Sequence, residues 1–189
     1  MAKVIKLHLK KCFFERKWAR SCFFGSPDLP LEYLDIVKDD ELFLAQINLE
    51  ELRKVYNSSL LPNHGILYFF IGLNDYRGIV RHNIHSVYNE RYFGRIDFNN
   101  EINGIDNYIK EYKIKFEYNK SDDKSFLLDE DFKSPSMLPN DIILLQYNQK
   151  YGPKILETEG LIQFVIDRDE LIKGNFESVR LLIVRNENI

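Results

Sequence analysis

Apolar residues recur along the chain with a period of two or in short unbroken runs, and both patterns predict strands. In residues 5–9 apolar side chains alternate with Lys and His, and in residues 112–118 aromatic and apolar side chains alternate with Lys and Glu. Residues 66–72 are almost wholly apolar, which predicts a strand buried on both faces. The predicted strands cover residues 5–9, 20–24, 42–47, 66–72, 83–90, 112–118, 141–148, 161–166 and 179–184.

Two capping patterns predict short helices between these strands. Asn48 is followed three residues later by an acid, which is typical of a helix N-terminus, and we expect this helix to reach about Tyr56. Asp167 opens a similar pattern, and Gly174 fits the position just past the end of the second helix. The sequence therefore predicts a β-dominated α+β fold in a single compact domain over residues 1–189.

Segments of the first half of the sequence return in the same order in the second half. Residues 43–48 read FLAQIN and residues 143–148 read ILLQYN; a Ser-Pro turn precedes each, and a Gly with an apolar strand follows each. This similarity predicts two similar packed β units related by an internal pseudo-two-fold axis. We expect approximate halves at 1–120 and 133–189, joined by an acidic linker at 121–132.

Each repeated strand contains one polar residue among apolar neighbours, Gln46 in the first and Gln146 in the second. A buried amide needs hydrogen-bond partners, or it costs about 1–3 kcal/mol. One interpretation is that each amide fixes a neighbouring loop, such as the Ser-Pro connector before it. The other interpretation is that both glutamines line a cleft between the halves and contact a ligand.

The composition indicates which broad class of protein this is, but it does not indicate a function. The 189 residues are 44% hydrophobic, which excludes global disorder, and 26 basic against 29 acidic residues give a net charge of only −3. Cys12 and Cys22 lack the spacing of a metal site and are expected to be reduced. The first residues interleave Lys with apolar residues, unlike a signal peptide, and no apolar run is long enough to span a bilayer. We therefore expect a cytoplasmic protein without a membrane partner.

No motif in the chain identifies a catalytic or cofactor site. His82 and His85 have the HxxH spacing of a metal site, but on a strand they would point to opposite faces, so they are weak metal candidates. A nucleophile elbow and glycine-rich phosphate loops are missing, and no spacing selects a pair of carboxylates. The segment from Lys3 to Arg20 is basic and carries aromatics, but it lacks the dense interleaving of an RNA-binding strand pair. The sequence predicts no cofactor, and it makes nucleic acid an unlikely partner.

Several motifs together resemble those of one known family. Residues 21–30 read SCFFGSPDLP, residues 43–49 read FLAQINL and residues 61–70 read LPNHGILYFF; LLQ at 144–146 and GLIQF at 160–164 follow. These segments resemble the YwqG-like family, a mostly bacterial domain of unknown function, with Ser replacing its second Gly in the first motif. The resemblance implies a compact, mostly β intracellular fold and supplies no activity. It also implies a context of toxin neutralisation for some members.

Three functions are left open, in decreasing order of support. The first is a non-catalytic protein-binding module, immunity-like or regulatory, which rests on the acid-rich stretch at 28–51 and the tyrosines at 88–92. The second is a small-ligand-binding or hydrolytic protein that uses a cleft between the halves. The third is a nucleic-acid role for the basic N-terminal segment.

Overall fold

The computed structural model describes residues 3–12, 17–84, 93–95, 110–120, 125–129, 136–155 and 160–185. Its strands are β1 (Lys3–Lys11), β2 (Cys22–Phe23), β3 (Asp28–Pro30), β4 (Glu41–Asn48), β5 (Ile66–Gly72), β6 (Arg77–Asn83), β7 (Phe93–Arg95), β8 (Tyr112–Lys120), β9 (Phe126–Asp129), β10 (Asp141–Asn148), β11 (Gly160–Asp167) and β12 (Arg180–Arg185). The α-helices are α1 (Leu49–Arg53) and α2 (Arg168–Ile172), and the 3₁₀ turns are η1 (Leu31–Tyr33), η3 (Gln149–Tyr151) and η4 (Phe176–Ser178). The β-dominated prediction is confirmed.

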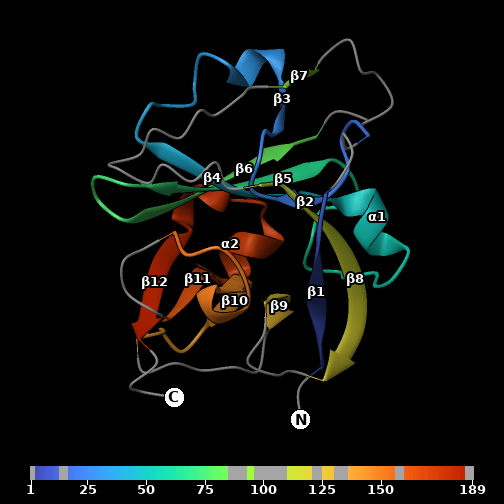
Figure 1. Ribbon diagram of the computed structural model, residues 1–189. Coiled ribbons are helices and arrows are strands. Elements are labelled where there is room, and N and C mark those ends of the chain that lie inside the picture. The colour runs from blue at the N-terminus through green and yellow to red at the C-terminus, as the bar shows by residue number, and fades with distance from the viewer. Residues whose placement is uncertain are drawn as a thin grey trace.

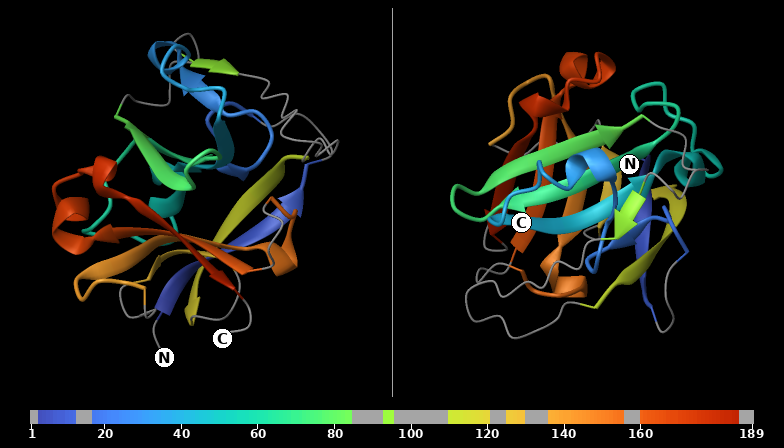
Figure 2. Two further views of the ribbon diagram at one scale, coloured as in Figure 1. Left: turned by 90° about the vertical axis from the view of Figure 1, so that its left-hand side faces the viewer. Right: turned by 90° about the horizontal axis from the view of Figure 1, so that it is seen from above.

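Ten of these strands form one antiparallel sheet in the order β12-β11-β10-β9-β1-β8-β2-β4-β5-β6 (Figure 1). The sheet curls until its two edge strands come together: a Cβ added at Gly78 in β6 would lie 3.3 Å from the main chain of Arg180 and Leu181 in β12. Figure 2 shows the layer of β4, β5 and β6 crossing over that of β10, β11 and β12. Outside this sheet, β3 and β7 form a separate two-stranded ladder.

Strands β1 and β8 form the middle of the sheet, and their alternating sequences decide which face is buried. Leu7 pairs with Phe116 in the register, and both side chains are buried. The neighbouring pair, His8 and Lys115, faces the other way because successive side chains of a strand point to opposite faces. The curled sheet therefore has an apolar inner face and, along β1 and β8, a charged outer face.

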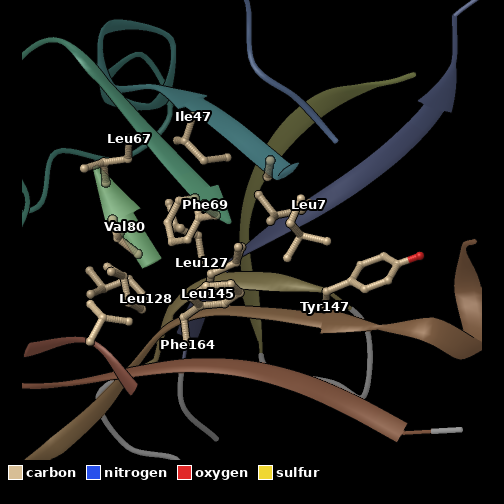
Figure 3. Packing of buried hydrophobic residues seen from close by; sticks show 14 of the residues in the cluster. Leu7, Ile47, Leu67, Phe69, Val80, Leu127, Leu128, Leu145, Tyr147 and Phe164 are labelled. Carbon is tan, nitrogen blue, oxygen red and sulfur yellow. The ribbon is translucent and has the colours of Figure 1, made fainter. Parts of the chain in front are cut away.

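The inner face encloses the largest hydrophobic cluster, which draws residues from both layers. Phe69 of β5 and Phe164 of β11 contact each other edge to face, with 5.3 Å between ring centroids, and both are fully buried. Figure 3 shows them converging with Val80, Leu127 and Leu145 from three further strands. The two layers thus share a single core.

Two smaller clusters cover the opposite, outer face of the sheet. The first lies on β4 and β5 and consists of Ala19, Cys22, Leu29, Phe43, Ile66, Tyr68, Phe70 and Phe93. The second lies on β9, β10 and β11 and consists of Val4, Phe126, Ile143 and Val165. The β3–β7 ladder and η1 belong to the layer that covers the first of these clusters.

Strands β4 and β10 resemble each other in the lengths of their neighbouring strands, in the irregularity of their pairing and in the residue that caps the turn after them. Each lies between a short strand and a long one, and each register shifts by one residue, at Leu44 in β4 and at Leu144 in β10. The side chains of Asn48 and Asn148 then cap the helical turns that follow, accepting from the main-chain N–H groups of Glu51 and Lys150.

Their short neighbours in the sheet, β2 and β9, also resemble each other. The main-chain N–H groups of Asn48 and Asn148 donate to the hydroxyls of Ser21 and Ser125, at 2.9 and 3.2 Å. Three residues after each serine, Phe24 and Leu128 adopt positive φ angles of 56° and 55°, which non-glycine residues rarely do.

Most of the predicted strands are confirmed, as β1, β2, β4, β5, β8, β10, β11 and β12. Both predicted helices are confirmed as well, although α1 ends at Arg53, before Tyr56. The strand predicted at 83–90 lies, beyond Ile84, outside the described residues, and β6 precedes it. The predicted linker contains β9, and its residues 121–124 and 130–132 lie outside the described part of the chain. The division into halves stays a prediction.

Candidate functional site

Gln46 is fully buried in β4 and fastens the segment that leads into β3. Its Oε1 accepts a hydrogen bond from the main-chain N–H of Asp28 at 2.8 Å. Its Nε2 donates to the carbonyl oxygen of Arg20 at 2.8 Å and to Asp28 Oδ2 at 3.2 Å. The amide therefore holds the Ser-Pro connector on the sheet.

The carboxylate of Asp28 is the centre of this network and is 0% exposed. Its Oδ2 accepts from the main-chain N–H of Ala19, and its Oδ1 accepts from Arg95 Nε in β7, both at 2.8 Å. The Tyr68 hydroxyl donates to the Asp28 carbonyl oxygen at 2.6 Å, and the Arg95 guanidinium lies 4.6 Å above the Trp18 ring. Asp28 thus joins three segments that are distant in sequence.

Gln146 is also buried, but the side chain that hydrogen-bonds its Oε1 belongs to the neighbouring strand. Gln163 Nε2 donates to Gln146 Oε1 at 2.7 Å, across the β10–β11 pairing. Within the described part of the chain, the buried Oε1 of Gln163 has no hydrogen-bond partner. An unsatisfied buried acceptor of this kind costs about 1–3 kcal/mol.

The structure places the two glutamines on outer faces of different parts of the sheet and does not bring them together. Gln46 lies directly opposite Cys22 and Tyr68, which belong to the cluster over β4 and β5. Gln146 lies opposite Phe126, which belongs to the cluster over β9, β10 and β11. The space between the two layers is filled by the largest hydrophobic cluster. A ligand contact by either glutamine stays a prediction.

Two further buried carboxylates pair with arginines, and the sequence reasoning did not single them out. Glu41 opens β4 and receives Arg81 of β6 in a bidentate pair, with Nη–Oε distances of 2.7 and 2.9 Å. Asp141 opens β10 and pairs with Arg180 of β12. The available signal was an acid at the first position of an otherwise apolar strand. Since a buried charge is retained only with a partner, each of these acids predicts a cation, and here the arginine lies two strands away in the sheet.

His82 lies in β6 at the place where the sheet nearly closes. Its Nε2 is 3.1 Å from the carbonyl oxygen of His64, and its ring contacts Phe176 of η4 with 5.7 Å between centroids. Burial lowers the pKa of His82 below its ordinary value of 6.5, and the hydrogen bond to His64 offsets only part of that effect. His85 lies outside the described residues, so the proposed pairing of His82 with His85 as metal ligands stays a prediction.

This environment makes His82 a source of acid sensitivity. Because the pKa is lower in the folded state, the unfolded chain takes up the proton more readily as the pH falls below 6.5. The contribution of His82 to the free energy of unfolding is therefore fully present above pH 6.5 and is lost towards lower pH. We expect the difference in free energy of unfolding between the wild type and His82→Gln to be smaller at pH 5 than at pH 7, as measured by urea unfolding. Parallel stability profiles over that range would contradict this assignment.

Neither cysteine resembles an activated nucleophile. Neither forms a disulfide, and Cys22 is buried in β2. Burial and the hydrogen bond to Glu111 raise the pKa of Cys12 to about 11, despite the nearby Lys113. The thiolate, which is the reactive form, is therefore scarce at neutral pH.

The connector between β3 and β4 presents three large apolar side chains to solvent. Leu31, Leu34 and Ile36, which we call the apolar ridge, are 51%, 36% and 52% exposed. Glu32 and Asp35 stand between them in the sequence and are exposed as well. Figure 1 shows this turn beside the β3–β7 ladder, at the end of the molecule away from β10–β12.

The ridge is held by the side chains that alternate with it. The Tyr33 hydroxyl donates to the His82 carbonyl oxygen at 3.0 Å, and its ring packs edge to face on Tyr68. Val37 packs against the outer cluster, and its N–H donates to the Tyr33 carbonyl oxygen at 3.2 Å. The exposed residues therefore stand on an ordered turn.

The buried polar groups described above hold the fold together, and they do not converge on a shared space. In the described segments, no three His, Cys, Asp or Glu residues gather as metal ligands would. None of the described helices has the length and apolar character needed to cross a bilayer. Among the described residues, the apolar ridge is the place where three large exposed apolar side chains lie within six positions of one another, and Leu31 and Leu34 border Gly94 of β7.

Comparison with known proteins gives one assignment. No curated protein matches the chain. Residues 21–141, which run from the start of β2 to the start of β10, match a family described as "Domain of unknown function (DUF1963)". The matched stretch includes Asp28, Gln46 and the apolar ridge. The chain therefore belongs to this family of unknown function.

Proposed function

We propose that this chain is a non-catalytic, cytoplasmic protein-binding module, immunity-like or regulatory, and that within its family it is YwqG-like. The observation that carries the proposal is the apolar ridge, in which three large side chains are exposed on one short turn. Scattered exposed apolar residues are normal, whereas grouped ones mark interaction sites. The two cysteines, neither of which forms a disulfide, agree with a reducing compartment.

The anchoring of the turn favours binding over simple exposure. Association is weakened by the entropy of ordering loops, so a turn that is already fixed loses less on binding. Here Tyr33 is fixed by the His82 carbonyl oxygen and the Tyr68 ring, and Asp28 fixes the strand just before the turn. The expected partner is a protein with an apolar pocket bordered by cations. Such a pocket would complement the ridge side chains and the acids Glu32 and Asp35 that stand between them in the sequence.

We also propose that the fold arose by internal duplication, with a pseudo-two-fold axis through the middle of the β1–β8 pair. The support is the matched register shifts, asparagine caps, serine acceptors and positive φ angles of β2–β4 and β9–β10. These features assign β8 and β9 to the second unit, so the boundary that fits them lies before Tyr112. In this arrangement the ridge belongs to the first unit alone.

The small-ligand or hydrolytic alternative ranks second. The region between the two layers, where its cleft would lie, is packed with apolar side chains. A thermal-shift screen over metals, nucleotides and sugars tests it, since a ligand that binds the folded state raises the melting temperature.

The apolar ridge is tested by affinity purification of partners from the native host, using a double substitution, Leu31→Ser with Ile36→Ser. The matched control is Leu138→Ser with Ile172→Ser, because these residues are 59% and 58% exposed but lie elsewhere. We expect a protein retained by the wild type and the control to be lost by the ridge variant. With that protein purified, the ridge variant should bind at least about tenfold more weakly, since central apolar contacts carry most interface energy.

Both variants should keep the melting temperature of the wild type within a few degrees, because half-exposed positions contribute little to stability. Equal binding by the ridge variant and the wild type would overturn the proposal. So would equal losses in the ridge variant and the control.

A further inference from the structure

The outer face of β1 and β8 carries a row of basic residues at the centre of the sheet. Lys6, His8 and Lys10 point outward from β1, and Lys113 and Lys115 point outward from β8, because the residues between them face the core. We call these five residues the cationic ladder. Lys10, Lys113 and Lys115 are exposed, and the other two are half-buried.

The register places like charges against each other. Lys10 lies directly opposite Lys113, and Lys115 lies two residues further along the same face of β8. Like charges at directly opposed positions destabilise a sheet by up to about 1 kcal/mol a pair. Glu117 lies directly opposite Lys6, and its carboxylate is 2.9 Å from His8 Nε2. Lys10, Lys113 and Lys115 make this part of the face positive in a chain whose net charge is −3.

We infer that the cationic ladder binds an acidic segment of a partner protein in extended conformation. Alternate side chains of a strand lie about 6.8 Å apart, and those of an extended peptide have the same spacing. An acidic segment aligned with β1 would therefore bring every second carboxylate close to a member of the ladder. Binding would relieve the repulsion between Lys10 and Lys113.

The aromatic residues of these strands favour a peptide over a single-stranded nucleic acid. Sequence-tolerant binding of single strands uses aromatic side chains on which bases stack. Among the described residues of β8, Tyr112 packs towards the core and Tyr118 stacks on Tyr56, at 4.5 Å between centroids. The outward positions between them hold Lys113, Lys115 and Glu117. The ladder thus offers charges without a stacking platform.

This surface is separate from the apolar ridge, so the two proposals can fail independently. The probe is a fluorescent 16-residue peptide of alternating Glu and Ser, with alternating Gln and Ser as the neutral peptide and a 16-nucleotide oligo-dT as the nucleic acid. The variant is Lys113→Glu with Lys115→Glu. Its matched control is Lys38→Glu with Lys54→Glu, which makes the same charge change at exposed positions outside β1 and β8.

We expect the wild type and the control to bind the acidic peptide at 20 mM salt, and the ladder variant to bind about tenfold or more weakly. Raising the salt to 200 mM should remove most of the difference, because exposed charges are then screened. Circular dichroism of the ladder variant should match that of the wild type. The inference is overturned if the wild type fails to bind the acidic peptide, if the control loses as much affinity as the ladder variant, or if the oligonucleotide binds more tightly than the peptide.

Discussion

Replacing Asp28 by Ala is expected to lower the free energy of unfolding by about 3–5 kcal/mol, the cost of breaking a buried ion pair. The substitution leaves Arg95 without its carboxylate, and the Ala19 N–H and one donor of Gln46 lose the same acceptor. Each of these groups is buried or partly buried, so water does not readily replace the lost bonds. Urea unfolding followed by circular dichroism gives the measurement.

A double variant keeps the result interpretable. Adding Arg95→Met to Asp28→Ala removes the uncompensated charge, so the double variant should recover part of the lost stability. The control is Asp75→Ala, which removes a solvent-exposed ion pair with Arg77 and should leave the urea midpoint unchanged. The network would have to be reinterpreted if Asp28→Ala and Asp75→Ala behaved alike.

Replacing Phe164 by Ala is expected to cost about 3–5 kcal/mol and to weaken both layers of the protein together. Phe164 belongs to β11 but contacts Phe69 of β5, and both lie in the one core that the layers share. Thermal and urea unfolding should therefore remain single transitions at lower midpoints. A cycle with Phe69→Ala should show a coupling of about 1 kcal/mol for the aromatic contact.

The matched control for this variant is Ile172→Ala, at a position that is 58% exposed and should have little effect. Two separate transitions in the Phe164→Ala variant would contradict the shared core. That result would show that one layer can unfold while the other stays folded.

Strands with a strong local pattern could be predicted from the sequence, and those without one could not. Strand β5 is apolar along almost all of its seven residues, strand β10 contains four consecutive apolar residues, and both are found at the predicted positions. Strand β9 has only four residues, between acidic stretches, and the sequence predicts a linker at its position. It is a strand because β1 and β10 pair with its two edges, which is tertiary information that no local pattern contains.

The candidate site shows the same limit. A glutamine within an apolar strand predicted a buried amide with a structural partner, and Gln46 has one in the Ser-Pro connector. Its second partner group, the Asp28 carboxylate, depends on Arg95, which is 67 residues away. The apolar ridge was also hidden, because Leu31, Leu34 and Ile36 look like core residues until the turn that exposes them is known.

The pairing of the first strand has a consequence for how the chain acquires its structure. Ile5 of β1 pairs with Tyr118 on one side and Leu127 on the other, so both partners are more than a hundred residues away. Contacts between such distant residues close large loops, which slows folding in comparison with local pairing. During synthesis, β1 must wait until β8 and β9 have left the ribosome. Until then its unpaired edges are open to other chains, and its lysines supply the charge that discourages such pairing.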